Sequence, residues 1–454
     1  MKKMLFVALT VCAMLFSGIT VSAATTTGTT GINVLLNRNA DAVVLKDLGK
    51  YGTVLDVVAE IHALTMRIKT DKIAAVKALP YVTAVSVDAV RNGAPIDTVA
   101  AENFSGGMNT WNLDAINVTN FGTNVRSVEQ DGTGVYVAVL DTGLVDAWRQ
   151  YFPQERIATE YAIAFGGGGG ETGNVSTPTN KWEHDQNSHG THVTSTILGY
   201  SMSGTKINGV APMATIIPVK VLNQNGSGWS SVIAQGIIYV ADLKKGPLSD
   251  HPVVINMSLG GSALEPMEQA AIDYAIKAGV IIVASAGNEG EAGMGYPGAY
   301  APVISVAASG WTGEWTAANF WRTLDVADPN NINDFYITDF SSRAKTGQDL
   351  DIAAPGSWIV GPYQKNSGQI SYFFLGGTSM ASPHIAGIVA LMAQKDKTLT
   401  AAEAETILES SALPLPAGSR TITNSDKTTS LMSWGSDATG AGLVDAIAAL
   451  AATN

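Results

Sequence analysis

Cysteine is almost absent from this chain. The single cysteine among the 454 residues is Cys12, and it lies in an N-terminal stretch that we expect to be removed. We therefore expect a mature protein with no disulfide and no thiol chemistry. Histidine is also scarce, with six residues, and none stands in the HExxH spacing of a zinc protease. The sequence gives only a weak indication of a metal bound by histidine.

Charged residues are few as well, at 15%, whereas apolar residues make up 46%. This composition is that of a globular chain and excludes an intrinsically disordered one. The length allows two or three domains with a large core. The formal net charge of −12 argues against a nucleic-acid partner, which would need a basic face. The sequence carries no clear oligomer signal, and we expect a monomer.

Residues 1–23 have the three parts of a signal peptide. Lys2 and Lys3 give a charged start, residues 4–16 an apolar centre, and residues 21–23 a small-residue exit. The apolar centre is too short to favour a membrane span. The pattern predicts a secreted protein with no stable membrane anchor.

Residues 24–103 form a separate unit. Strand and helix periodicities alternate in the order β-α-β-β-α-β, which predicts a small ferredoxin-like α+β module. The predicted strands are residues 32–36, 53–58, 63–69 and 82–88, and the predicted helices are residues 40–51 and 71–79. Asp71 resembles a helix cap. Residues 92–108, with Gly, Pro, Asn and Ser, predict an exposed linker.

The remaining residues, 104–454, have the pattern of an α/β domain. Residues 135–140 are a continuous apolar run, typical of a parallel strand buried on both faces. Asp141 follows directly, at the end of the strand where open α/β sheets bind their ligands. Taken alone, Asp141 is better explained as a loop cap than as a catalytic group.

Two further stretches carry candidate chemistry. His189 and His192 enter an apolar helix, and Ser379 follows paired glycines at the start of another. Backbone N–H groups at a helix start can bind a developing anion. Taken alone, Ser379 is a helix cap and His192 is a structural histidine. The chain order Asp, His, Ser is nevertheless one of the three orders in which convergent serine-protease triads occur.

Six blocks of the sequence resemble the signature blocks of the subtilisin-like serine proteases. They are residues 141–143, 189–193, 226–228, 256–260, 284–288 and 377–384. The likeness extends over roughly residues 111–450. It implies the family's doubly wound, mostly parallel sheet with helices on both faces. It also implies that residues 24–103 are an inhibitory propeptide that acts on its own chain.

The resemblance implies a role for each matching residue. Ser379 would attack the substrate carbonyl, His189 would carry the proton, and Asp141 would orient His189. Asn288 and the Ser379 N–H would bind the oxyanion. Extended polypeptide substrates would lie along a second set of residues, namely Gly226, Ser227, Gly228, Ser258, Leu259, Gly260, Ala284 and Gly287. Catalysis would need no cofactor.

We expect the chain to be a serine endopeptidase that cleaves its own zymogen between about residues 91 and 111. The small pocket residues predict broad specificity, with large apolar side chains preferred before the cleaved bond. Glu289 would tolerate Lys or Arg there. The sequence disfavours two other functions. An inactive binding protein of the same shape is disfavoured because all four catalytic positions are filled, and a lipase or esterase would need Gly-x-Ser-x-Gly.

A long insertion at residues 310–336 adds two expectations. Its aromatic residues predict a small satellite core. Its oxygen-bearing side chains predict a solvated turn by default, with a structural calcium site as the alternative. These side chains belong to Asp325, Asp328, Asn330, Asn333 and Asp334.

Overall fold

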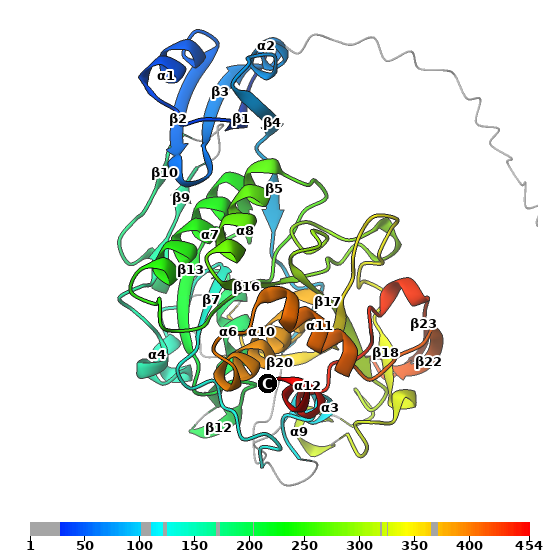
Figure 1. Cartoon of the computed structure of the whole chain (residues 1–454). Helices are drawn as coiled ribbons and strands as arrows, with labels where there is room; N and C mark the ends of the chain where they lie inside the picture. The colour runs from blue at the N-terminus through cyan, green and yellow to red at the C-terminus, as the bar shows by residue number, and fades with distance from the viewer. Residues whose placement is uncertain are drawn as a thin grey trace, which may run out of the picture.

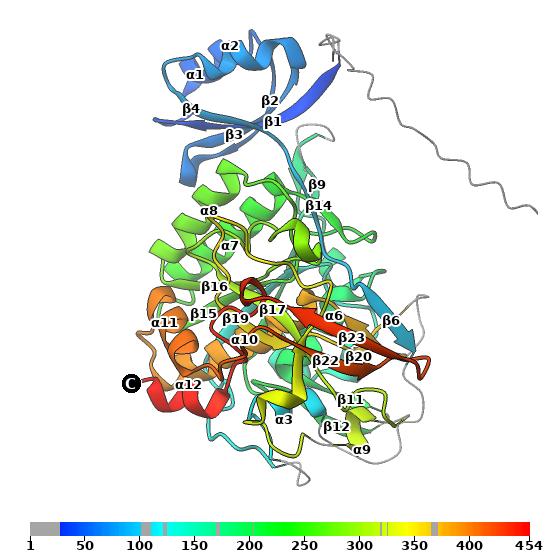
Figure 2. The ribbon, with the colours of Figure 1, turned by 90° about the vertical axis from the view of Figure 1, so that its right-hand side faces the viewer.

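The computed structural model describes residues 28–100, 110–120, 125–168, 173–202, 204–317, 320–324, 326–364 and 371–454. An N-terminal module (residues 28–87) lies above a larger α/β domain. A connecting segment (residues 88–100) runs down the side of that domain (Figures 1 and 2). The predicted signal peptide lies outside the described residues. Within the described ranges, no helix has both the length and the apolar character needed to cross a membrane.

The N-terminal module is an antiparallel sheet covered by two short helices. Its strands, in the order β2-β3-β1-β4, are β1 (Thr29–Leu36), β2 (Gly52–Val58), β3 (Ala63–Lys69) and β4 (Val82–Val87), and its helices are α1 (Ala42–Leu48) and α2 (Ile73–Lys77). Asp41 caps α1 by accepting from two backbone N–H groups. Asp71 does not cap α2, because it lies within a 3₁₀ turn that precedes the helix. Apolar residues such as Val34, Leu48 and Met66 fill a core of the module's own.

A mostly parallel sheet forms the centre of the larger domain. The sheet order is β18-β17-β16-β15-β7-β13-β8, with β19 also paired to β17, and only β18 runs antiparallel to its neighbour. The strands are β7 (Tyr136–Asp141), β8 (Ile163–Ala164), β13 (Thr215–Lys220), β15 (Val253–Met257), β16 (Val280–Ser285), β17 (Ile304–Trp311), β18 (Phe335–Ile337) and β19 (Ile352–Pro355).

Helices cover both faces of this sheet (Figure 1). On one face lie α6 (His189–Leu198) and α10 (Thr378–Lys395), and on the other α7 (Ser230–Lys245) and α8 (Pro266–Lys277). Alternate residues of β7 serve the two cores: Val137 and Val139 pack towards the first pair, and Ala138 and Leu140 towards the second. The doubly wound fold that the family resemblance implies is confirmed. The N-terminal module sits on α7 and α8, and its Val58 and Ala63 join their core.

The connecting segment includes the first part of the exposed linker predicted at residues 92–108, and residue 92 and residues 97–100 are strand instead. It forms β5 (Val90–Asn92), paired antiparallel with β14 (Ser227–Trp229), and β6 (Asp97–Ala100), paired antiparallel with β21 (Tyr372–Gly376). Beyond it, β21 pairs with β20 (Ile359–Pro362). Free strand edges in the larger domain supply backbone partners that local sequence does not reveal. Residues 101–109 lie outside the described residues.

The aromatic side chains of the insertion do not form a separate core. Trp311, Trp315, Phe320 and Trp321 are buried within the main cluster, and Phe320 stacks on Phe374 of β21. The other elements are α3 (Trp111–Ala115), α4 (Trp148–Tyr151), β9 (Gly166–Gly167), β10 (Val175–Ser176), β11 (Gly199–Met202), β12 (Thr205–Asn208), α9 (Phe320–Thr323), α11 (Ala401–Ser411), β22 (Gly418–Thr423), β23 (Thr429–Trp434) and α12 (Ala446–Ala452).

Candidate active site

Asp141 and His189 meet at the carboxyl end of the central sheet. Asp141 is the last residue of β7, and His189 is the first residue of α6. The His189 Nδ1 atom lies 2.8 and 2.9 Å from the two Asp141 carboxylate oxygens, and both residues are fully buried. The opposite ring nitrogen, Nε2, has no hydrogen-bond partner among the described residues. The carboxylate therefore fixes the ring and leaves one nitrogen available.

A turn before α6 holds His189 in place. The Thr142 hydroxyl donates to Asp185 at 2.7 Å and accepts from the Gly190 N–H at 2.9 Å. Asp185 also accepts from the Ser188 N–H at 2.8 Å, and Ser188 has the left-handed φ of 77°. Burial raises the pKa of Asp185. This network ties the end of β7 to the start of α6, so the Asp141–His189 geometry does not depend on those two side chains alone.

Ser379 is the second residue of α10, and its backbone carbonyl has an unusual partner. Pro383, four residues on, lies inside the helix and has no N–H to donate to that carbonyl. The Ser258 hydroxyl donates to it instead at 2.8 Å. In return, the Ser379 hydroxyl donates to the Ser258 carbonyl at 3.1 Å. In this state the hydroxyl of the nucleophile candidate donates its hydrogen bond to a carbonyl and not to His189.

Asn288 lies beside the start of α10. Its side-chain oxygen accepts from both the N–H and the hydroxyl of Thr378, each at 2.9 Å. These two donors require the oxygen of the amide to face Thr378. The amide NH₂ group is thereby turned away from Thr378 and remains available as a donor. Gly287, with a φ of 107°, donates its N–H to the Thr378 hydroxyl at 3.2 Å.

The predicted substrate-binding segments lie on either side of the connecting segment. Asn92 exchanges two backbone hydrogen bonds of 2.9 Å with Gly260, and the Gly93 N–H donates to the Gly226 carbonyl at 2.9 Å. A methyl group added to Gly93 would lie 3.4 Å from the His189 ring and 2.8 Å from the Ser258 carbonyl oxygen. The chain's own backbone thus passes directly over the Asp141–His189 pair and Ser258.

Comparison with known proteins identifies the family of this chain. Residues 132–441 match the subtilase family of peptidases. The chain belongs to the subtilase family. This subtilase is 33% identical to thermitase from Thermoactinomyces vulgaris over 268 residues, which are 59% of this chain and 78% of thermitase. It is 33% identical to subtilisin DY from Bacillus licheniformis over 295 residues, 64% of this chain and 88% of that protein.

Solved structures agree with the sequence match. Fervidolysin from Fervidobacterium pennivorans, described as a keratinolytic enzyme related to subtilisin, superposes with a TM-score of 0.64 at 25% identity. The match covers 93% of the subtilase and 61% of the fervidolysin chain. Sphericase superposes with a TM-score of 0.54 at 29% identity, over 75% of the subtilase and 99% of that chain. The subtilase is therefore a serine endopeptidase of the subtilisin type.

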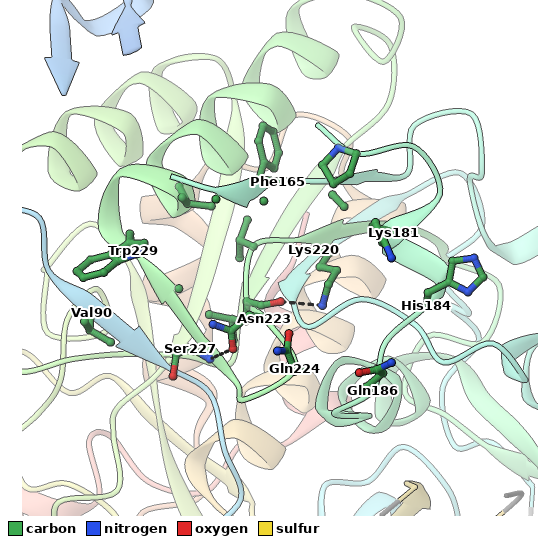
Figure 3. A pocket seen from close by; sticks show the side chains of 18 residues that line it. Val90, Phe165, Lys181, His184, Gln186, Lys220, Asn223, Gln224, Ser227 and Trp229 are labelled. Carbon is green, nitrogen blue, oxygen red and sulfur yellow. Dashed lines mark hydrogen bonds between the residues drawn. The ribbon is translucent and has the colours of Figure 1, made fainter. Parts of the chain in front are cut away.

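A pocket of about 570 Å³ adjoins the cleft of the subtilase. Figure 3 shows it between β14 and the loops before α6, with Val90 and Trp229 at one side and Lys181 and His184 at the other. Its lining residues do not include Asp141, His189 or Ser379. The pocket thus lies beside the Asp141–His189 pair, and Ser227 and Gly228 of the predicted substrate-binding segments contribute to its lining.

Two predicted binding residues have their side chains in the core. Leu259 and Ala284 are buried in the cluster beneath α7 and α8. Glu289, in contrast, is exposed, and its carboxylate accepts from Ser342 at 3.0 Å beside Gly287.

His192 is structural: its Nε2 faces the Ile359 carbonyl at 3.1 Å, and burial lowers its pKa to about 3.

The calcium expectation stays a prediction. Asp328 accepts from the N–H of Asn330 at 3.0 Å, which is a local turn contact, and Asp325 lies outside the described residues. Within the described ranges, one group of carboxylates has the spacing of a metal site, and it is elsewhere: Asp349, Asp351 and Glu405.

Three residues of the site were missed from the sequence. Thr378 orients Asn288, Asp185 holds the turn before His189, and Glu268 of α8 binds Arg91 of the connecting segment. The position of Thr378, directly before Ser379 in the same sequence block, was the signal that could have indicated it. Glu268 had no local signal, because its partner is 177 residues away.

Proposed function

We propose that this subtilase is secreted as a zymogen that processes itself and hydrolyses polypeptides through Asp141, His189 and Ser379. The observation that carries the proposal is the buried Asp141–His189 pair, whose Nε2 has no hydrogen-bond partner among the described residues and whose ring lies beside an extended segment of the same chain. An extended peptide lying between two strand edges is how a protease presents a bond for attack.

The chemistry uses side chains of this chain alone. When a substrate replaces the connecting segment, the Ser379 hydroxyl turns from Ser258 towards His189 Nε2 and gives up its proton as its oxygen attacks the carbonyl carbon. Asp141 stabilises the imidazolium through Nδ1. The backbone N–H of Ser379 and the Asn288 amide donate to the oxyanion.

Breakdown of the tetrahedral intermediate completes the first half. His189 protonates the leaving amine, which departs and leaves an acyl group on Ser379. A water molecule then attacks the acyl-enzyme with His189 again as the base, and the acid product leaves. The proton of the Ser379 hydroxyl leaves with the amine, and His189 later passes the proton of the water to the Ser379 oxygen, so the enzyme is restored only after the second half.

The N-terminal module and the connecting segment act as the inhibitor within the zymogen. The segment occupies the cleft, and the Ser379 hydroxyl is engaged with Ser258. Cleavage between about residues 91 and 111 would release the module. The mature enzyme is expected to be a monomer of broad specificity, with the exposed Glu289 tolerating a basic residue before the cleaved bond.

Comparison of wild type with one variant, Ser379→Ala, tests the proposal. Wild type should label at Ser379 with a fluorophosphonate, cut casein and accumulate as a shortened chain. Ser379→Ala should do none of these and remain at the zymogen length in a protease-free host. Equal shortening of both chains would show that another protease does the processing. Failure of the wild type to label under conditions that release the module would refute the triad.

A further inference from the structure

Arg91 of the connecting segment is a fully buried arginine bound to a buried carboxylate. Its Nε lies 3.2 and 3.1 Å from the two Glu268 oxygens, and its Nη2 lies 2.6 Å from one of them. The Nη2 atom also donates to the Ala263 carbonyl at 2.8 Å. Both side chains are at most 2% exposed. A guanidinium bound through two nitrogens to one carboxylate is the strongest form of ion pair in proteins.

The Arg91 side chain occupies a place prepared by the larger domain. Gly261 lies against it, and a methyl group added there would come within 2.9 Å of Nη1 and 2.6 Å of the Val90 carbonyl. Glu268 is held by its own helix, since its N–H donates to Glu265 at 2.8 Å. Burial raises the pKa of Glu268, and Arg91 opposes that rise. Among the described residues, no other cation forms an ion pair with Glu268.

One strand register and one pair of hydrogen bonds fix where Arg91 stands relative to Ser379. Asn92 pairs antiparallel with Gly260, and the same register continued by two residues places Ala94 opposite Ser258. Ser258 exchanges hydrogen bonds of 2.8 and 3.1 Å with Ser379, so Ala94 is the residue nearest the attacking hydroxyl in this register. Arg91 is therefore the third residue before the one whose carbonyl would be attacked.

Removal of the connecting segment opens this place to substrate. The cleft then presents the Glu268 carboxylate at the bottom of a narrow site with the Ala263 carbonyl beside it. A substrate that binds along β14 and Gly260 in the same register brings its own side chain there. Leaving that carboxylate buried and unpaired would be costly, whereas an arginine restores both contacts. Lysine, a single point charge, restores fewer.

We propose that Glu268 selects arginine in the substrate, at the third residue before the one whose carbonyl is attacked. The proposal rests on the proposed function and adds a substrate class to it: chains with an arginine at this position. Arg91 is, in this view, the zymogen's own copy of the preferred substrate side chain.

The experiment compares quenched fluorescent peptides that differ at one position. The parent contains Arg-Asn-Gly-Ala-Ser-Ile, and its partners carry Lys or Ala in place of Arg. Mature wild type should cut the Arg peptide at least about tenfold faster in kcat/KM than the Ala peptide, because truncating one side of a buried ion pair has effects of this size or larger. The Lys peptide should fall between.

Variants assign the preference to Glu268. Glu268→Gln alone would leave the Arg91 guanidinium buried without a carboxylate in the zymogen. It is therefore made together with Arg91→Gln, so that the chain folds with an uncharged pair. The mature double variant should lose the ratio of Arg to Ala cleavage. Asp273→Asn is the matched control: it removes the same charge from an exposed position on the same helix and should keep the ratio.

Each outcome decides. Equal cleavage of the Arg and Ala peptides by a wild type that labels at Ser379 overturns the inference and leaves the proposed function standing. Persistence of the Arg preference in the double variant also overturns it, since the selector then lies elsewhere. An enzyme that neither labels nor cuts any peptide refutes the proposed function and the inference together.

Discussion

Asn288 combines two roles in different atoms, and substitution can separate them. Its oxygen accepts two hydrogen bonds from Thr378, and its NH₂ group is the proposed oxyanion donor. Asn288→Ala removes both. The lost donor meets little charge in the ground state and a full charge in the tetrahedral intermediate, so the effect should fall on kcat and spare KM.

The two losses have different sizes. Removal of such a donor from a subtilisin lowers kcat by about 10²–10³, or ~2.7–4 kcal/mol, and we carry that magnitude over to this relative. The lost acceptor frees two partly buried donors of Thr378. At about 1 kcal/mol for each hydrogen bond, the free energy of unfolding should fall by about 2 kcal/mol. Asn288→Ala should thus show both a large kcat defect and a lowered thermal midpoint.

Asn288→Asp separates the roles. The carboxylate keeps an acceptor for Thr378 but offers no donor, and its charge opposes the oxyanion. Its kcat should fall at least as far as that of Asn288→Ala, while its thermal midpoint stays near wild type. Steady-state kinetics on one peptide and a thermal scan of active-site-blocked protein give the numbers. A near-normal kcat in either variant would refute the oxyanion role and leave Asn288 as a turn cap.

Two further predictions concern the zymogen, and a third concerns the pH dependence of stability. Pro95 follows Ala94 at the attack position, and the ring carbon bonded to its nitrogen obstructs protonation of that leaving nitrogen by His189. Wild type should therefore not mature to an N-terminus at Pro95, whereas Pro95→Ala should gain a terminus at residue 95 in N-terminal sequencing. Asp88 accepts three hydrogen bonds of 2.6–3.1 Å from Ser230 and Ser231 at the start of α7. If these bonds together contribute a net ~2 kcal/mol to holding the connecting segment in the cleft, Asp88→Ala should raise the rate of fluorophosphonate labelling of the uncut zymogen roughly 30-fold. An unchanged labelling rate would contradict this. Burial raises the pKa of Glu314 to about 8, so its protonated form favours folding at low pH and that contribution is lost as pH rises from about 4.5 to 8. In a Ser379→Ala background, the thermal midpoint should fall less over this interval with Glu314→Gln, and parallel curves would show that Glu314 does not titrate there.

Local sequence was enough to predict the buried strand that ends at Asp141, and the family resemblance supplied the candidate residues of the site. The run at residues 135–140 and the small-residue blocks around His189 and Ser379 carry their structural meaning within a few positions, because strand ends and helix starts are set locally. Their mutual distances could not be read from sequence, but the order of the blocks indicated a family in which they meet.

The features missed from sequence depend on partners far along the chain. Asn92, Gly93 and Pro95 have the composition of a loop, yet strand edges of the larger domain pair with the chain on both sides of them. Arg91 and Glu268 are each unremarkable in their own surroundings and become a buried pair only when α8 packs beside β5. Asp71 failed as a helix cap because the turn there is 3₁₀.

Only Asp88 and Ala89 separate the N-terminal module from the strand that fills the cleft. In the proposed zymogen, this tether holds the inhibitory segment at an effective concentration on the order of millimolar or above, whatever the amount of protein in solution. Dilution therefore does not activate the zymogen. A cut beyond residue 100 turns the same contacts into those of a complex between two molecules. Latency then depends on concentration, and transfer into a large volume becomes sufficient to release the enzyme.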